Sequence, residues 1–379
     1  MKIKDVRTSK IKLVEHLGEV EPAWTPGTAS ITSTIGGYDF TEIELDSGEI
    51  GIGPGCDKIT IKDSKEYLIG KSPNDVIEHY KFLLNKTRNY PYSGLAGIDI
   101  ALWDLKGKIE EKSISSILGR KKDTLVPYAS YVILSEPEER AEISKKMLDE
   151  GWKAIKVRLH HKEEELDVQT IEKIKEKTGD DLTILVDANQ AQSTYNSYKF
   201  SNWQAGIMWD MDRAKRMNEE MFELGCYWLE EPRPRYNFNE LSELVSMKKT
   251  KIAGGENNTT ISDFYEILNK NSYDILQPES MVLGGITPLI KIGELSKKFN
   301  KEIVPHHGGG DIGVVAHMHL LSSWDNAPFC EMLNDPPLNS YKNKFFIFNE
   351  NLEVEKGIIN VPNVPGLGVT IKEDLIIRE

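Results

Sequence analysis

The feature that most constrains the fold of this chain is an alternation of short apolar runs and charged stretches after Val126. Eight runs rich in β-branched residues occur there, separated by amphipathic stretches of helix length. The runs are VPYASYVIL, KAIKVRLH, LTILVDANQ, CYWLEEP, KIAGGEN, DILQPES, EIVPHHGG and FCEMLND. Strands that alternate with helices in this way pair in parallel, so the pattern predicts an α/β protein with a (β/α) barrel.

The rest of the chain predicts a second, smaller unit, because 379 residues exceed the roughly 200–250 that one barrel needs. Residues 1 to about 62 alternate as strands do, with a hairpin turn at Asp46-Ser47-Gly48. Residues 74–120 have the period of helices. The segment from Glu15 to Ser30, which includes Trp24, is expected to form a polar loop between strands.

The C-terminal tail VPNVPGLGVTIKEDLIIRE is rich in Pro and Gly and then has the pattern of a strand. We expect it to cross back onto the N-terminal unit. The predicted organisation is therefore an N-terminal unit over residues 1–122, completed by residues 360–379, and a barrel over residues 123–359.

Composition and charge disfavour several kinds of partner. The formal net charge of −13 disfavours nucleic acid, because binding to phosphates requires a basic face. No run of 18 apolar residues occurs, so no membrane span is expected, and the N-terminal residues alternate like a strand and not like a signal peptide. The three cysteines are widely spaced and lack a CxxC pattern, which favours a reduced, cytoplasmic setting.

Three acids stand at the ends of consecutive runs, which in a barrel form the catalytic rim. They are Asp187 in LVDANQ, Glu230 in WLEEP and Glu256 in GGEN, called here the carboxylate triad. A single acid at a strand end is usually a helix N-cap or a surface charge. Three that converge repel each other unless a cation neutralises them, and all-oxygen ligation suits Mg²⁺, with Mn²⁺ as a substitute. The neighbouring Glu231 points the other way along its strand and is expected to be structural.

Two cationic residues share one side of the second run. Lys156 and Arg158 in KAIKVRLH are two residues apart, so both side chains are expected to face the barrel interior near the rim. A buried cation pair needs an anionic partner. That partner is either a substrate carboxylate or the carboxylate triad itself, and the sequence leaves both open.

The seventh run ends in two histidines, His306 and His307. Glu279, at the end of the sixth run, is expected to lie beside His306, where it would orient the imidazole and raise its basicity as a general base requires. His307 is the histidine that we expect to satisfy backbone groups. The glycines Gly308–Gly310 either bring a helix N-terminus close to a ligand or form a plain turn.

Glu331 ends the eighth run in FCEML. It is either a further acid of the site, able to donate to a substrate oxygen when protonated, or an ordinary charge at a strand end.

These residues resemble the enolase superfamily, specifically its mandelate racemase-like subgroup, over nearly the whole chain. The resemblance rests on GIDIALWDLKGK, the pair Lys156-x-Arg158, VDANQ, WLEEP, GGEN, QPES, the His306 run, Glu331 and the tail PGLGV. It implies an α+β capping domain over a modified (β/α)7β barrel. It also implies one Mg²⁺ on the carboxylate triad and abstraction of the proton α to a substrate carboxylate, giving an enediolate that the metal stabilises.

The resemblance assigns roles by position. His306 would be the base and Glu279 its partner, Lys156 would neutralise the substrate carboxylate, and Glu331 would donate to the enediolate oxygen. Trp24, Asn189 and His307 are predicted to contact the substrate.

Two residues depart from the family's pattern. Arg158 stands where many members have a lysine that serves as a second base, and a guanidinium stays protonated. Glu279 stands where Asp is usual, so the length of its hydrogen bond to His306 is open. With a single base, elimination is favoured over racemisation.

The predicted function is that of a sugar-acid dehydratase that acts on aldonates or aldarates. The substrate carboxylate and 2-hydroxyl would chelate Mg²⁺, and His306 would take the C2 proton and help the 3-hydroxyl leave. One alternative is an isomerase, meaning an epimerase or a lactone cycloisomerase, which keeps the same residues. Another is a non-catalytic metal-binding barrel, which the near-complete set of acid, base and electrophile disfavours.

Specificity is expected to depend on two segments. One is the loop from Glu15 to Ser30, and the other is the aromatic insertion 192–206, which we interpret either as a lid that excludes water or as an oligomer contact. The expected partner is a small carboxylate substrate, and a homo-oligomer is usual for such proteins.

Overall fold

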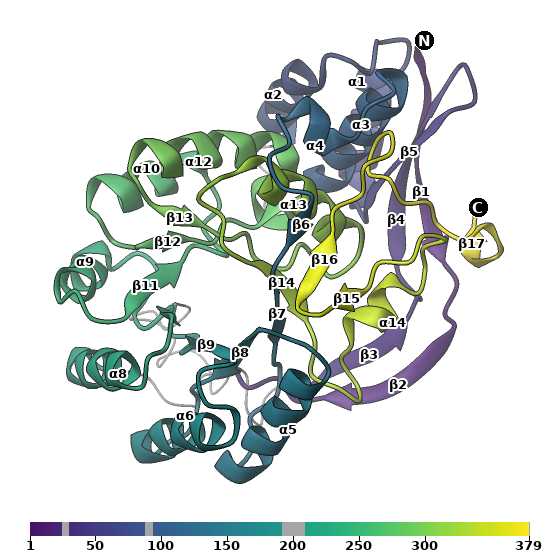
Figure 1. Ribbon diagram of the computed structural model, residues 1–379. Coiled ribbons are helices and arrows are strands. Elements are labelled where there is room, and N and C mark those ends of the chain that lie inside the picture. Colours follow the sequence, from purple (N-terminus) through teal and green to yellow (C-terminus); the bar gives the residue numbers. More distant parts are fainter. Residues whose placement is uncertain (25–29, 88–93, 192–208, 379) are drawn as a thin grey trace.

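An eight-stranded parallel sheet curls into a barrel at the centre of the molecule (Figure 1). The computed structural model describes residues 1–24, 30–87, 94–191 and 209–378. The order of strands in the sheet is β13-β12-β11-β10-β9-β8-β7-β14. The strands are β7 (Pro127–Ser130), β8 (Ala154–Arg158), β9 (Thr183–Asp187), β10 (Trp228–Glu230), β11 (Lys251–Gly254), β12 (Ile275–Leu276), β13 (Glu302–Ile303) and β14 (Cys330–Leu333). Each lies within one of the eight predicted runs, so the predicted barrel is confirmed.

Helices on the outside of the sheet connect successive strands (Figure 1). Their apolar faces pack against the sheet. Side-chain caps fix several of the helix starts: Asp210 accepts from the Arg213 N–H, and Thr260 and Asp263 form a capping box. The helices are α5 (Pro137–Asp149), α6 (Glu164–Thr178), α8 (Met211–Glu223), α9 (Phe238–Ser246), α10 (Ile261–Asn269), α11 (Ser280–Leu283), α12 (Ile286–Lys298) and α13 (Ile312–Ser323).

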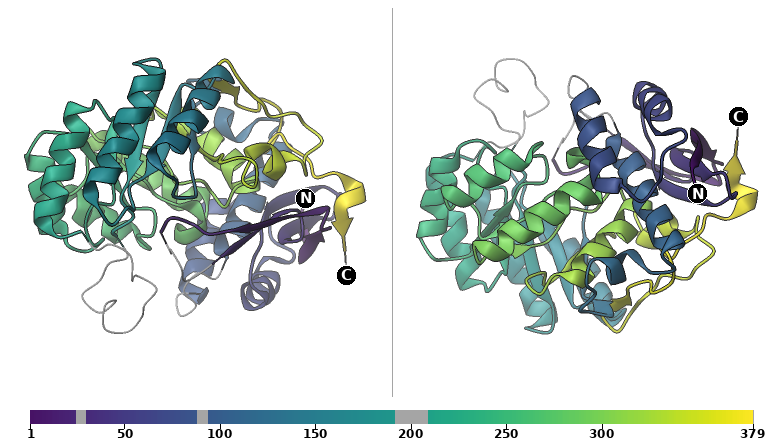
Figure 2. Two further views of the ribbon diagram at one scale, coloured as in Figure 1. Left: turned by 90° about the horizontal axis from the view of Figure 1, so that it is seen from below. Right: turned by 90° about the horizontal axis from the view of Figure 1, so that it is seen from above.

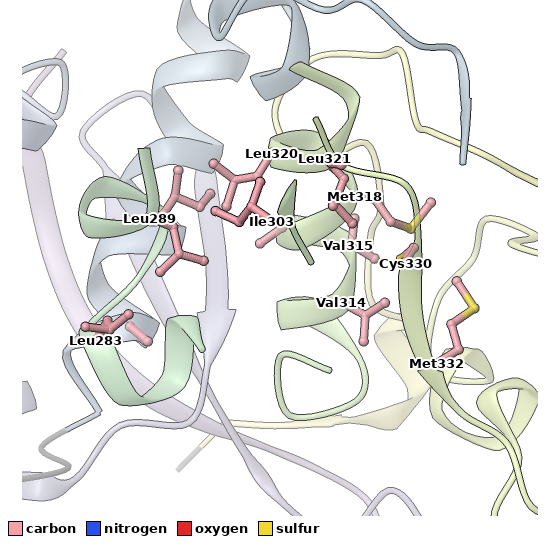
Figure 3. Close-up of a cluster of buried hydrophobic side chains, with 14 of the residues drawn as sticks. Leu283, Leu289, Ile303, Val314, Val315, Met318, Leu320, Leu321, Cys330 and Met332 are labelled. Carbon is pink, nitrogen blue, oxygen red and sulfur yellow. The ribbon is translucent and has the colours of Figure 1, made fainter. Parts of the chain in front are cut away.

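Helix α13 differs from the other barrel helices because all twelve of its residues are buried. Its sequence IGVVAHMHLLSS is apolar on nearly every side, which is typical of a helix enclosed by protein. Figure 3 shows Val314 and Leu321 between Leu289 on one side and Met332 on the other. The barrel wall and the N-terminal unit are thus joined through one continuous apolar core.

The N-terminal unit lies against one side of the barrel (Figure 2). Its antiparallel sheet has the order β17-β1-β4-β5, and a separate hairpin pairs β2 with β3. Gly51 and Gly53 let the sheet approach helix α3 closely, because a Cβ at Gly53 would lie 2.0 Å from the Gly97 carbonyl oxygen. The elements are β1 (Ile3–Ile11), β2 (Glu15–Val20), β3 (Ile31–Ile35), β4 (Asp39–Leu45), β5 (Ile50–Pro54), α1 (Lys58–Leu68), α2 (Val76–Thr87), α3 (Leu95–Ile109) and α4 (Ile114–Ile117).

The tail returns to this unit as predicted: β17 (Ile376–Ile377) pairs with β1, with Lys10 opposite Ile377. Short strands β6 (Thr124–Leu125), β15 (Val354–Glu355) and β16 (Ile358–Asn360) form a third small sheet. A short helix α14 (Tyr341–Phe345) and a 3₁₀ turn at Glu373–Leu375 complete the described elements.

Two expectations for the N-terminal unit were wrong. Residues up to about 62 do not remain in strands, because helix α1 begins at Lys58, where Asp57 accepts from the Ile59 and Thr60 N–H groups. The β-branched letters of this stretch suggest a strand, but its buried residues lie four apart, as on a helix. The predicted loop from Glu15 also begins as strand β2, which is paired with β3 across to Ile31.

Within the described parts of the chain, no helix is long and apolar enough to cross a membrane.

Candidate active site

Site residues lie one step above an apolar floor that closes the barrel. The floor consists of Tyr128, Ala154, Leu185, Trp228, Ala253, Ile275 and Val304, which pack together as a separate buried cluster. Because side chains alternate along a strand, the residue two positions later faces the same side. That residue is Lys156 after Ala154, Asp187 after Leu185, Glu230 after Trp228 and His306 after Val304. Local strand geometry therefore sets these side chains in one layer at the rim.

Lys156 lies at the centre of this layer and is fully buried. Its Nζ lies 2.9 Å from Glu230 Oε1, 2.9 Å from Glu331 Oε1 and 3.4 Å from Asp187 Oδ2. Burial opposes the charged amine, but the three carboxylates outweigh it and raise the pKa of Lys156. In this arrangement the carboxylates themselves are the anionic partners of Lys156.

Arg158 is also buried, and its guanidinium is engaged in several contacts. Its guanidinium forms an ion pair with Asp187 and donates to the Asn189 side-chain oxygen at 3.0 Å and the Tyr131 carbonyl at 2.8 Å. The ring of Trp24 lies 4.9 Å from the guanidinium carbon, a cation–π distance. Its Nη2 also donates to the Ser130 hydroxyl at 3.5 Å, so several different groups hold Arg158 in place.

The carboxylate triad comes from adjacent strands, with Glu230 in register with Asp187. Burial together with the nearby charge of Asp187 raises the pKa of Glu230 to about 8, although Lys156 opposes the shift. The charges of Arg158 and Lys156 outweigh burial at Asp187 and lower its pKa. Gln277 and the Trp228 indole also donate to Glu230, at 2.8 and 3.1 Å.

The donor set at this rim suits a divalent cation. Five buried carboxyl groups meet two permanent cations, so the layer carries excess negative charge, which the raised pKa of Glu230 reflects. The carboxyl groups are those of Asp187, Glu230, Glu256, Glu279 and Glu331, and the cations are Lys156 and Arg158. All-oxygen ligands of this kind match Mg²⁺.

The triad is nevertheless not gathered as a ready-made metal site. Among the described residues, the group whose ligand atoms all lie within 4.8 Å of one another is Glu279, His306 and His307. The triad oxygens instead face cations: Lys156 contacts Glu230, and His306 Nε2 lies 3.1 Å from Glu256 Oε2.

His306 and Glu279 are brought together, with Nδ1 2.9 Å from Glu279 Oε2. Burial opposes the protonated ring, but Glu256, Glu331 and Glu279 outweigh it and raise the pKa of His306 to about 10. The hydrogen bond from His306 likewise outweighs burial and lowers the pKa of Glu279 to about 2. The longer Glu side chain thus reaches the imidazole at an ordinary hydrogen-bond distance.

His307 and Glu331 flank this pair. The His307 ring lies 4.0 Å from the His306 ring, and its Nδ1 accepts from the Gly309 N–H at 3.1 Å, as expected for a histidine that satisfies the backbone. Burial and the neighbouring His306 lower the pKa of His307 to about 3. Burial opposes the charged carboxylate of Glu331, but the nearby charges of Lys156 and His306 outweigh it and lower the pKa of Glu331.

The three predicted substrate-contacting residues all lie at this rim. Asn189 has a positive φ of 46° and bonds Asp187 through its N–H at 2.8 Å and its side chain at 3.2 Å. Trp24 covers Arg158. The aromatic insertion 192–206 lies outside the described residues.

Sequence reasoning missed two residues that support the site. Gln277 bonds Glu230, and its position two residues after the floor residue Ile275 was a readable signal. His317 on α13 is a core residue, but its Nε2 lies 2.8 Å from the Ser280 hydroxyl and 3.8 Å from Glu279. No local pattern marks that contact.

The barrel, the N-terminal unit and the charged rim define an enolase-type barrel enzyme. Residues 139–375 match the family described as enolase C-terminal domain-like. Residues 28–119 match the N-terminal domain of mandelate racemase and muconate lactonizing enzymes. The chain belongs to this family of the enolase superfamily.

Similar proteins carry the names of two reaction types. The chain is 31% identical to the arabinonate dehydratase of Saccharolobus solfataricus, over 98% of this chain and 97% of that protein. It is 27% identical to the D-galactarolactone cycloisomerase of Agrobacterium fabrum, over 99% and 98%. The crystal structure of L-talarate dehydratase from Polaromonas, complexed with Mg and L-glucarate, superposes with a TM-score of 0.81 at 25% identity, covering 99% of this chain and 96% of that one.

Proposed function

We propose that this protein is a Mg²⁺-dependent dehydratase of sugar acids, which converts an aldonate or aldarate into a 2-keto-3-deoxy acid. The observation that carries the proposal is the asymmetry of the rim. One side holds a histidine hydrogen-bonded to a buried carboxylate, and the other holds Arg158 bound to Asp187. A single general base facing a permanently charged group favours one-sided proton abstraction.

The charge of Glu256 contributes most to the raised pKa of His306, and a cation on the carboxylate triad would neutralise that charge. In this proposal the neutral form of His306 removes the proton from C2 of the substrate. The C2–H electron pair forms the C2–C3 double bond as the C3–O bond breaks. His306, now protonated, returns its proton to the departing 3-hydroxyl, which leaves as water from the same face. The enol product then tautomerises to the 2-keto acid. Glu279 positions the ring throughout, because Met281 and Gly308 N–H groups fix its carboxylate at 2.9 Å each.

Asp187, Glu230 and Glu256 would hold the metal. A bound Mg²⁺ would supply positive charge where negative charge develops on the substrate carboxylate. Lys156 adds a second positive charge beside the same position. With the triad neutralised, Lys156 would be less committed to Asp187 and Glu230, and its ammonium could pair with the substrate carboxylate.

Arg158 and Asn189 are proposed to hold the rim in place opposite the base. Arg158 cannot take a proton from C2 at neutral pH, because a guanidinium stays protonated. Burial by itself would lower its pKa, but the charge of Asp187 outweighs burial and raises it. Racemisation by two bases is therefore disfavoured.

An isomerase of the same family is the second candidate, since the cycloisomerase from Agrobacterium fabrum is similar over its whole length. Proton abstraction by His306 is common to both reactions. They differ in whether water is lost, so product mass separates them.

The experiment is a dehydration screen of aldonic and aldaric acids with added Mg²⁺. Semicarbazide detects the 2-keto product, and mass spectrometry detects the loss of water. The dehydratase proposal expects a 2-keto-3-deoxy product from at least one acid. A product of unchanged mass, or C2 exchange with solvent deuterium and no loss of water, would instead indicate an isomerase.

A further inference from the structure

The side chains of Glu279, His306 and His307 form a second cluster of metal-binding groups beside the carboxylate triad. Their ligand atoms all lie within 4.8 Å of one another. We propose that this cluster binds a transition-metal dication, with Zn²⁺ as the representative ion, and that the bound ion blocks proton transfer. The inhibitory part of this proposal rests on the proposed function, because His306 and Glu279 are its base and positioning residue.

The spacing of the cluster is close to that of a tetrahedral zinc site. Ligands about 2.0–2.1 Å from a zinc ion are roughly 3.3 Å from one another. His306 Nδ1 and Glu279 Oε2 are already 2.9 Å apart, and the two imidazole rings lie 4.0 Å apart at their centres. Small rotations of the side chains would complete a site of two histidines and one glutamate, a ligand set that zinc uses.

Backbone groups hold two of the three ligands. Glu279 accepts from the Met281 and Gly308 N–H groups, each at 2.9 Å. His307 Nδ1 accepts from the Gly309 N–H at 3.1 Å, which fixes the ring and leaves Nε2 for an ion. Such outer contacts orient metal ligands. Both histidines are partly exposed, so an ion from solvent can reach them.

The chemistry of the two clusters separates two kinds of ion. The carboxylate triad offers only oxygen, which Mg²⁺ prefers. The second cluster offers two imidazole nitrogens, which Mg²⁺ binds poorly and Zn²⁺ binds well. An excess of Mg²⁺ should therefore not displace zinc from the second cluster.

Zinc bound here would coordinate His306 Nδ1 in place of the proton that this nitrogen shares with Glu279, and that proton would move to Nε2. With Nδ1 committed to the ion and Nε2 protonated, the neutral ring would have no lone pair left to accept a proton from C2. Inhibition would persist at saturating Mg²⁺.

The test is isothermal titration of the full-length protein with ZnCl₂ in saturating MgCl₂, comparing the wild type, His307→Gln and the control His16→Gln, which changes a histidine in the N-terminal hairpin. Loss of an outer contact costs a metal site about 10–100-fold in affinity, so loss of a ligand should cost at least about 100-fold. We expect this weakening for His307→Gln and unchanged binding for the control. Co²⁺ should give a visible absorption band that His307→Gln lacks.

Equal zinc affinity in the wild type and His307→Gln, with unchanged circular dichroism, would overturn the proposal. So would zinc that excess Mg²⁺ displaces, because that result would place the ion on the carboxylate triad. If His307→Gln fails to fold, Glu279→Gln tests the same loss of a ligand. The titration needs no substrate, so its outcome does not depend on whether a sugar acid is dehydrated.

Discussion

At the ends of β8 to β10, the acidic side chains outnumber the two cations, Lys156 and Arg158, that they contact. At the ends of β12 and β13, by contrast, one acid, Glu279, pairs with one histidine, His306. The pKa values of the two glutamates record the difference. That of Glu230 is raised to about 8, chiefly by burial and the charge of Asp187, whereas His306 outweighs burial and lowers that of Glu279 to about 2.

This contrast shows how the two halves of the rim differ in charge balance. The half around Glu230 lacks positive charge, which a divalent cation would supply. The half around Glu279 is electrostatically complete and has an imidazole held in a fixed orientation, which suits proton transfer. Four substitutions test this division.

The largest effect is expected for His306→Asn, which removes the proposed base. General acid–base catalysis contributes about 10²–10⁴-fold, and His306 acts in both proton transfers, so turnover should fall by about 10⁴-fold. Turnover and C2 proton exchange in deuterated water should fall together, while Mg²⁺ binding, measured by calorimetry, is retained. A variant that still exchanges the C2 proton at the wild-type rate would exclude His306 as the base.

Glu230→Gln should weaken Mg²⁺ binding by at least about 100-fold, because it removes a proposed ligand. It should destabilise the metal-free protein little, because burial and the charge of Asp187 disfavour the ionised form of Glu230 and raise its pKa.

The same substitution has a pH signature. The folded pKa of Glu230 lies above its ordinary value of 4.5, so the metal-free folded state binds the extra proton and loses stability as pH rises from about 4.5 to about 8. Glu230→Gln should remove this part of the pH dependence in thermal unfolding. An unchanged profile would contradict the charge excess inferred at this half of the rim.

Glu279→Gln should have the opposite effect on stability. A pKa lowered from 4.5 to about 2 corresponds to about 3 kcal/mol, which the ionised carboxylate contributes above pH 4.5 and loses as pH falls toward 2. Denaturant unfolding at pH 7 should therefore show a lower free energy of unfolding, and the difference from the wild type should shrink in acid. Equal stability of the two proteins at pH 7 would show that His306 does not stabilise the ionised carboxylate of Glu279.

The smallest effect is expected for Arg158→Lys. A lysine keeps the charge beside Asp187 but cannot also reach Asn189 and the Tyr131 carbonyl as the guanidinium does. We expect kcat/KM on the active acid to fall by about tenfold. The C2 epimer of the substrate provides the control. If the wild-type protein exchanged the C2 proton of this epimer with solvent deuterium, the assignment of a single base would be contradicted.

The sequence by itself determined the barrel and the composition of its rim. All eight strands lie in the predicted runs, and Asp187, Glu230 and His306 follow floor residues at a spacing of two. Both features are local, because strand alternation and parallel pairing depend only on short stretches of chain. Helix α1 escaped prediction because β-branched residues hide its helical period.

Only the tertiary structure decided which charges pair. Nothing near Lys156 in the sequence indicates that it contacts Glu331 on β14, or that Arg158 reaches both Asn189 and the Trp24 ring from the N-terminal unit. The lowered pKa of Glu331 follows from its pairing with Lys156. These contacts arise when the sheet curls and the N-terminal unit closes over it, and electrostatic interactions depend on distance in space, not on distance along the chain.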